Sequence, residues 1–87
     1  METLIHFSFR CPGAKSVALV GDFNDWSVTA HPMTRDPSGD LWVATLRLAP
    51  GRYEYKFFVN GGSWWNDPDA PKVPNAWGSE NSYLTVE

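Results

Sequence analysis

Apolar and polar residues alternate along much of this 87-residue chain, and a period of two is typical of β-strands. In the segment 4–10, the side chains of Ile5, Phe7 and Phe9 fall on one face of an extended backbone. The segment 52–60 repeats the pattern, with four apolar side chains on its inner face: Tyr53, Tyr55, Phe57 and Val59. Both segments are predicted to be strands with one face in a core.

Three further segments, 16–20, 41–48 and 82–86, are also predicted to be strands. In 41–48, Trp42 lies on the same face as three aliphatic side chains, which assigns it to the core. Turn-forming residues separate the strands at 11–15, 36–40, 49–51 and 60–63. The segment 64–78 has three prolines and no alternation, so it is predicted to be an ordered surface loop.

No segment combines the periodicity of an amphipathic helix with capping residues. Six to eight short strands, with turn signals about every ten residues, predict an all-β fold. The expected architecture is an immunoglobulin-like antiparallel β-sandwich of about seven strands. The length suits one domain and not two, so residues 1–87 are predicted to form a single β-sandwich domain.

Tryptophan is unusually frequent: aromatic residues make up 15% of the chain, and five of them are tryptophans. A core this small has room for about one or two indoles, so some are expected outside it. Besides Trp42, four lie at strand ends or in loops: Trp26, Trp64, Trp65 and Trp77. Because an extended backbone turns neighbouring side chains to opposite sides, either Trp64 or Trp65 is expected to pack inward.

Exposed indoles in loops favour a sugar as the ligand. The C–H groups of a pyranose form an apolar face that stacks on a flat indole and leaves water. The hydroxyl rim then needs polar partners, because unpaired hydroxyl groups cost free energy on burial. Suitable donors and acceptors lie near the tryptophans: Lys56, Asn60, Asn66, Ser79 and Asn81. The sequence predicts a non-catalytic binding site on an open surface platform.

Net charge and cysteine content limit the kinds of binding partner and the cellular compartment that are expected. The net charge of −3 disfavours nucleic acid or an anionic membrane surface as the main partner. Cys11 is the single cysteine, which excludes an internal disulfide and fits a reducing compartment. No signal peptide and no apolar run of roughly 20 residues is present, so a cytoplasmic location is expected. Whether the chain is a whole protein or one module of a longer one stays open.

Catalysis, metal binding and a cofactor are not expected. A glycosidase needs two carboxylates across a cleft, but the acidic candidates lie beside turn-forming residues: Asp22, Asp25, Asp67 and Asp69. His6, His31 and Cys11 lack the spacing of metal ligands. The alternative function is a protein-interaction module, in which the same aromatic patch docks on a glycogen-metabolism enzyme or a kinase.

Four segments carry a family resemblance: VGDFNDW at 20–26, YEYKFFVNG at 53–61, WWNDP at 64–68 and GSENS at 78–82. Together they resemble the glycogen-binding domain of AMP-activated protein kinase β-subunits. They are also similar to the isoamylase N-terminal domains of carbohydrate-binding module family 48. The resemblance implies an early-set immunoglobulin-like sandwich that binds α-1,4-glucan such as glycogen, starch or maltooligosaccharides.

The same resemblance implies roles for individual residues. Trp26 matches a tryptophan that stacks on one glucose, and Trp64 matches one that stacks on the next. Lys56 matches a lysine that contacts sugar hydroxyls, while Ser79 and Asn81 match the family's Thr and Asn.

Two departures from the family pattern affect the expected site. Where the family has a protruding leucine, this chain has Trp77, which is expected to offer a third stacking surface. The loop 60–63 is one residue longer than the family's common form, so Trp65 stays open as the alternative to Trp64.

Overall fold

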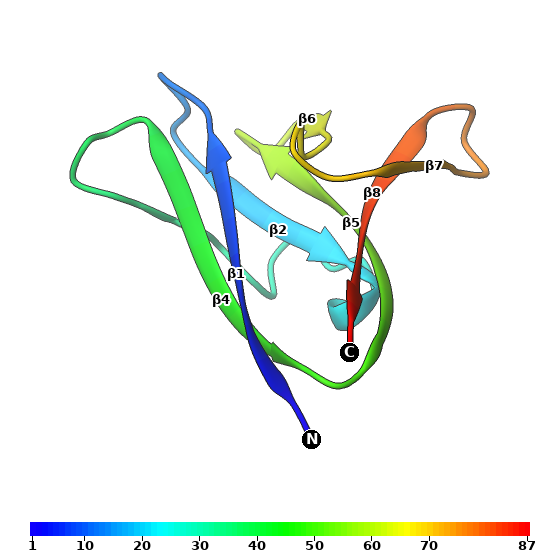
Figure 1. Ribbon diagram of the computed structural model, residues 1–87. Helices are drawn as coiled ribbons and strands as arrows, with labels where there is room; N and C mark the ends of the chain where they lie inside the picture. Colours follow the sequence, from blue (N-terminus) through cyan, green and yellow to red (C-terminus); the bar gives the residue numbers. More distant parts are fainter.

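Two antiparallel sheets face each other in the computed structural model, which describes residues 1–87 (Figure 1). The elements are β1 (Thr3–Arg10), β2 (Val17–Gly21), the 3₁₀ turn η1 (Asp22–Asn24), β3 (Thr34–Arg35), β4 (Leu41–Leu48), β5 (Gly51–Val59), β6 (Ser63–Trp65), β7 (Lys72–Pro74) and β8 (Glu80–Val86). The first sheet has the order β1-β4-β3, and the second has the order β2-β5-β8-β7 with β6 paired to β5. The prediction of an all-β antiparallel sandwich is confirmed, with eight strands where about seven were expected.

The longest strand, β5, organises the second sheet. Its first half, 51–55, pairs with β8, and its last three residues pair with β6. Its other edge pairs with β2. Side chains therefore alternate between the interior, which takes Tyr55 and Phe57, and the outer surface, which takes Glu54 and Lys56.

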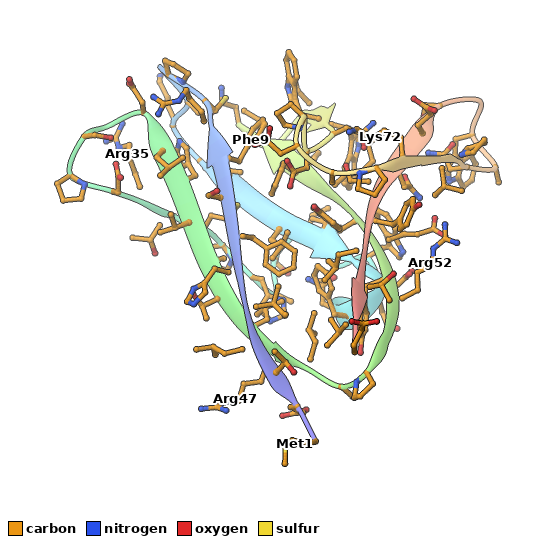
Figure 2. All side chains as sticks on the ribbon, in the orientation of Figure 1. Met1, Phe9, Arg35, Arg47, Arg52 and Lys72 are labelled. Carbon is orange, nitrogen blue, oxygen red and sulfur yellow. The ribbon has the colours of Figure 1, made fainter.

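Side chains from both sheets fill the interior between them (Figure 2), and five of the 12 residues in the buried core cluster are aromatic. Phe9 of β1 stacks on Phe57 of β5 with ring centroids 4.3 Å apart, and thus joins the two sheets. Phe7 meets Tyr55 edge to face at 5.2 Å. Trp42 is 6% exposed, so its prediction as a core residue is confirmed. Each of these large rings removes apolar area from water, which is the main favourable term in folding.

Strand β2 is buried along its whole length, although it lies at the edge of its sheet. The segment that follows η1 folds back over it and bonds to its backbone. The amide of Leu19 donates to the carbonyl of His31 at 2.9 Å, and Ala18 forms an isolated bridge with Pro32. This segment protects the edge of β2. His31 of the segment also lies within hydrogen-bond distance of Asn24, with its Nδ1 2.8 Å from Asn24 Nδ2, which helps to hold the turn that carries Trp26.

The predicted surface loop 64–78 needs a correction, because it contains the last two residues of the short strand β6 and the whole of the short strand β7. Each has only three residues, which is too short for alternation to show in the sequence. Pro74 is tolerated because β7 is an edge strand and has no second neighbour to receive an N–H bond.

The expectation that Trp64 or Trp65 packs inward is wrong. The register with β5 places Trp64 opposite Phe58 and Trp65 opposite Phe57, so the two indoles do point to opposite sides. Both are nevertheless exposed, at 46% and 54% of their surface. Neither indole belongs to the hydrophobic core cluster or packs against it, so the packed interior does not extend beneath β6.

Candidate functional site

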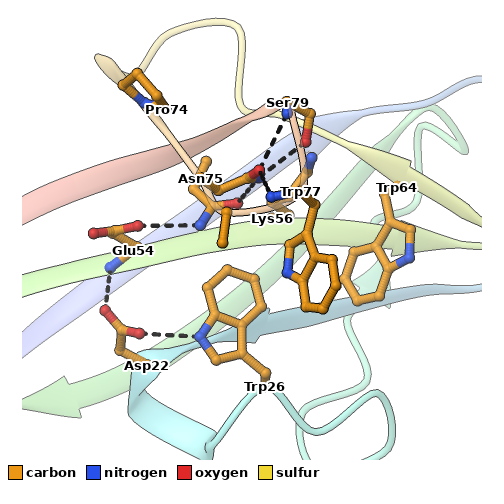
Figure 3. Close-up of a pocket in the computed structure, with 11 residues that line it drawn as sticks. Asp22, Trp26, Glu54, Lys56, Trp64, Pro74, Asn75, Trp77 and Ser79 are labelled. Atoms are coloured by element: carbon orange, nitrogen blue, oxygen red, sulfur yellow. Dashed lines mark hydrogen bonds between the residues drawn. The ribbon is translucent and has the colours of Figure 1, made fainter.

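A groove of about 980 Å³ lies on the outer face of the second sheet (Figure 3). All six residues predicted to bind a ligand line it: Trp26, Lys56, Trp64, Trp77, Ser79 and Asn81. The groove also contains Asp22, Glu54 and Asn75, which sequence reasoning did not assign to the site. The turn after β2 and the loop before β8 raise its walls, so the surface is more hollow than the expected open platform.

The floor of the groove is the outward face of β5. Alternation along this strand turns Glu54 and Lys56 out of the core, and both are half-buried. The single ion pair of the chain joins Arg10 to Asp40, so the Lys56 ammonium is not paired with a carboxylate. Lys56 can therefore donate hydrogen bonds to a ligand without first breaking a salt bridge.

The first wall is the turn from Gly21 to Trp26. Gly21 lies so close to β5 that a Cβ atom there would come within 2.5 Å of the Glu54 carbonyl oxygen. Asn24 closes the turn, since its Oδ1 accepts from the amides of Gly21 at 3.1 Å and Ser27 at 3.2 Å. Asp25 and Trp26 both take left-handed backbone conformations, with φ of 56° and 59°. The turn presents the half-buried Trp26 indole to the groove.

Asp22 connects this wall to the floor. Its Oδ1 accepts from the Trp26 indole Nε1 at 3.0 Å, and its Oδ2 accepts from the backbone amide of Glu54 at 2.8 Å (Figure 3). The sequence interpretation of Asp22 as a turn former missed both contacts. Asp22 and Trp26 are only four residues apart, so their contact could have been considered from the sequence. The contact between Asp22 and Glu54 spans 32 positions and leaves no local signal in the sequence.

Trp64 forms part of the second wall, on strand β6. Its ring packs against Phe58, its cross-strand neighbour, with centroids 4.6 Å apart. The opposite face of the indole remains available, which accords with its 46% exposure. Trp65 points to the other side of the strand and does not line the groove. The geometry therefore places Trp64, and not Trp65, beside Trp26 and Lys56.

Trp77 stands at the tip of the loop between β7 and β8 and is 89% exposed. Asn75 holds this loop from within, because its Oδ1 accepts from the amides of Trp77 at 2.9 Å and Ser79 at 3.1 Å. Its Nδ2 donates to Ser79 Oγ at 2.9 Å and to Asn81 Oδ1 at 3.0 Å. Gly78 takes φ of 80°, which a residue without a Cβ adopts at low cost. A single side-chain amide thus fixes the loop that carries Trp77.

Asn81 and Ser79 differ in how much surface they offer. Asn81 is only 8% exposed, and its Nδ2 donates to Glu54 Oε1 at 3.1 Å. Its amide therefore links β5 to the loop 75–79, called the Asn75 loop, beneath the groove. Ser79 is exposed at the rim. Asn60 and Asn66 do not line the groove. Of the predicted polar residues that do, Lys56 and Ser79 are more exposed than Asn81.

A buried contact behind the groove explains the Asn-Asp-Pro segment. The hydroxyl of Tyr55 donates to Asp67 Oδ2 at 2.7 Å, and Asp67 Oδ1 accepts from the amide of Asp69 at 3.0 Å. Burial, together with this carboxylate, raises the pKa of Tyr55 far above its ordinary value. Asn66 adds a bond from its Nδ2 to the carbonyl of Glu80 at 3.0 Å. These contacts tie the segment after β6 to β5 and β8.

Two structural facts bear on other kinds of site. The structure has no group of three or more His, Cys, Asp or Glu side chains arranged to hold a metal ion. It also has no helix with the length and apolar character that crossing a membrane requires.

Comparison of the sequence with a family profile and with individual proteins points to the same family. Residues 2–87 match the profile of a family described as the glycogen recognition site of AMP-activated protein kinase. The chain is 43% identical over 75 residues to 5'-AMP-activated protein kinase subunit beta-1 of Bos taurus and of Homo sapiens. Subunit beta-2 of Mus musculus is 40% identical over the same length. Each match covers 86% of this chain and 26% of the relative, so the chain spans about a quarter of these proteins.

Comparison of structures supports the fold. The whole chain superposes on 14% of a maltogenic amylase from S. marinus with a TM-score of 0.78 at 21% sequence identity. Similarity at this level of identity concerns the fold alone, and it agrees with the immunoglobulin-like sandwich expected from the sequence. Because the family profile covers nearly the full length, the chain belongs to the family of glycogen recognition domains of AMP-activated protein kinase.

Proposed function

We propose that the groove binds α-1,4-glucan, as glycogen, starch or maltooligosaccharides, by stacking glucose units on its indoles. One observation carries the proposal: three indoles from three separate segments, Trp26, Trp64 and Trp77, line the same groove. Membership of a glycogen recognition family supports the same ligand class.

The chemistry of the groove suits a neutral chain of sugars. An indole that is supported on one side offers its other face to the C–H groups of a pyranose. Lys56 and Ser79 donate hydrogen bonds to hydroxyl groups at the rim, and Asn81 lies at the base. Because the groove is open, much of the ligand stays in water, so we expect a dissociation constant between micromolar and millimolar, or about −8 to −4 kcal/mol.

Binding without catalysis is part of the proposal. Of the carboxylates that could act on a glycosidic bond, Asp22 accepts from a backbone amide and an indole, and Asp67 accepts from a tyrosine and a backbone amide. Both groups therefore have structural partners. No metal or cofactor is invoked. A cytoplasmic location, expected from the lone Cys11, stays a prediction.

Titration with maltoheptaose tests the proposal. The five indole N–H signals and the backbone amides are followed by ¹H–¹⁵N NMR while the sugar is added. Shifts are expected at Trp26, Trp64 and Trp77, and Trp42 should stay still because it is buried in the core. Cellohexaose, which has the same glucose units in β-linkage, is the matched control. Unmoved spectra at millimolar maltoheptaose would exclude the proposed function.

Docking on a protein is the second candidate function. It is favoured because the relatives are kinase subunits and this chain spans about a quarter of their length. The partner would be a kinase subunit or a glycogen-metabolism enzyme. Co-sedimentation with amylose, glycogen and cellulose separates the two candidates, since a docking module without a sugar site stays in the supernatant with all three.

A further inference from the structure

We propose that Asp22 is a positioning residue of the groove, whose carboxylate fixes the plane of the Trp26 indole against β5. The proposal rests on the proposed function, because a fixed plane matters only if a sugar stacks on it. Asp22 is not one of the residues that the family resemblance assigns to glucan binding.

The contacts of Asp22 join two parts of the molecule that are distant in sequence. One carboxylate oxygen takes the Trp26 indole N–H at 3.0 Å, and the other takes the Glu54 amide at 2.8 Å. Each oxygen has its own partner, so the carboxylate is a bridge from the end of the Trp26 side chain to the backbone of the central strand. Such charge-assisted bonds are shorter and stronger than bonds between neutral groups.

The bond to Asp22 is the one side-chain hydrogen bond that holds the Trp26 indole, whereas Trp64 is supported by packing on a ring. Trp64 has the Phe58 ring beneath it, whereas no aromatic ring pairs with Trp26. The backbone of Trp26 is itself unusual, because Asp25 and Trp26 occupy the left-handed region in succession. Without the bond to Asp22, the indole would be attached to a short strained turn and could rotate about its side-chain bonds.

A fixed indole binds sugar more tightly than a rotating one, because less conformational freedom is lost on binding. The anionic acceptor also polarises the indole N–H, which increases the electron density of the ring face that meets the sugar. Both effects act through Trp26. Asp22 need not touch the glucan to affect its affinity.

The experiment combines binding with a direct report on the indole. Asp22→Ala should weaken maltoheptaose binding about 3- to 10-fold, which corresponds to freeing one rotamer-rich side chain. Asp22→Asn retains one acceptor oxygen and should lie between wild type and Asp22→Ala. Asp25→Asn is the matched control, because it removes the same charge from the neighbouring position, which does not line the groove.

Repeating the Asp22→Ala substitution in a Trp26→Phe protein distinguishes an effect on the position of the indole from a general loss of folding. Trp26→Phe has no indole N–H, so adding Asp22→Ala to it should change affinity by less than about 2-fold. In the single variant, the Trp26 indole N–H signal should move and exchange faster with solvent. Thermal melting monitors folding, and Asp22→Asn replaces Asp22→Ala in each comparison if the alanine variant does not fold.

Two results would overturn the proposal: an unmoved Trp26 indole signal in Asp22→Ala, or an equal loss of affinity in the Trp26→Phe background. Failure of the proposed function looks different. In that case wild type itself leaves maltoheptaose unbound, while the indole signal still responds to the loss of Asp22.

Discussion

Trp42 and Trp77 show how the interior and the groove use the same side chain. Trp42 is 6% exposed at an alternating position of β4, within the cluster that includes the stacked rings of Phe9 and Phe57. Trp77 is 89% exposed and stands on a loop that Asn75 holds through its backbone. Interior rings are fixed from several sides by packing, whereas the Trp77 ring is held only through the backbone that carries it. The difference predicts that substitutions in the interior mainly lower stability and that substitutions in the groove mainly weaken binding.

The largest expected effect is on the free energy of unfolding after Phe57→Ala. Phe57 is completely buried, so its removal leaves a cavity and should destabilise the fold by about 3–5 kcal/mol. Urea unfolding followed by tryptophan fluorescence measures the loss. Phe57→Leu fills part of the cavity and should lose less. A cost below about 1 kcal/mol for the alanine variant would contradict the packing described for the interior.

Trp26→Ala should have the opposite effect: it should weaken sugar binding more than it lowers the stability of the fold. Central aromatic residues dominate binding surfaces, so affinity for maltoheptaose should fall by about 2 kcal/mol, or roughly 30-fold. Calorimetric titration measures the affinity, and urea unfolding should show a smaller change than for Phe57→Ala, because Trp26 is half-buried. If stability falls as much as for Phe57→Ala, the separation between interior and groove breaks down.

Trp77→Ala should leave stability within about 0.5 kcal/mol of wild type, because the side chain is almost fully exposed. Affinity for long maltooligosaccharides should fall several-fold, about 1 kcal/mol. Trp65→Ala is the matched control, since Trp65 is 54% exposed but does not line the groove. Equal losses of affinity in the two variants would show that exposure alone, and not position in the groove, determines binding.

The smallest effect is confined to alkaline pH and concerns Tyr55. Burial raises its pKa, so above a pH of about 10 the unfolded chain releases this proton while the folded chain keeps it. Stability is therefore unaffected below that pH and falls as the pH rises beyond it. Tyr55→Phe should remove this part of the fall, although it also leaves Asp67 without the hydroxyl that it accepts from. Urea unfolding at pH 8 and at pH 11 compares the two proteins. Identical pH dependence would contradict the buried state of the phenol.

Much of the fold could be predicted because it depends on alternation. The pattern in 52–60 located β5 and its two faces, and the pattern in 41–48 placed Trp42 in the core. The strands β3, β6 and β7 could not be found in this way, because two or three residues show no period and their pairing depends on β4, β5 and β8.

The site could be predicted only in part for a similar reason. The excess of tryptophans and the family resemblance indicated six residues that the fold brings to one groove. The supports beneath them were missed. Asp22 and Asn75 belong to residue types that usually form turns, and their contacts with Glu54 and Asn81 follow from the tertiary arrangement rather than from local sequence.

The Asn75 loop has a consequence for how this surface can evolve. The Asn75 side chain bonds to the backbone amide at position 77, to Ser79 and to Asn81, and none of these bonds uses the Trp77 side chain. Residue 77 can therefore be exchanged while the frame around it is retained. Related chains could diversify their ligand preference at this tip one substitution at a time, without passing through intermediates that fail to fold.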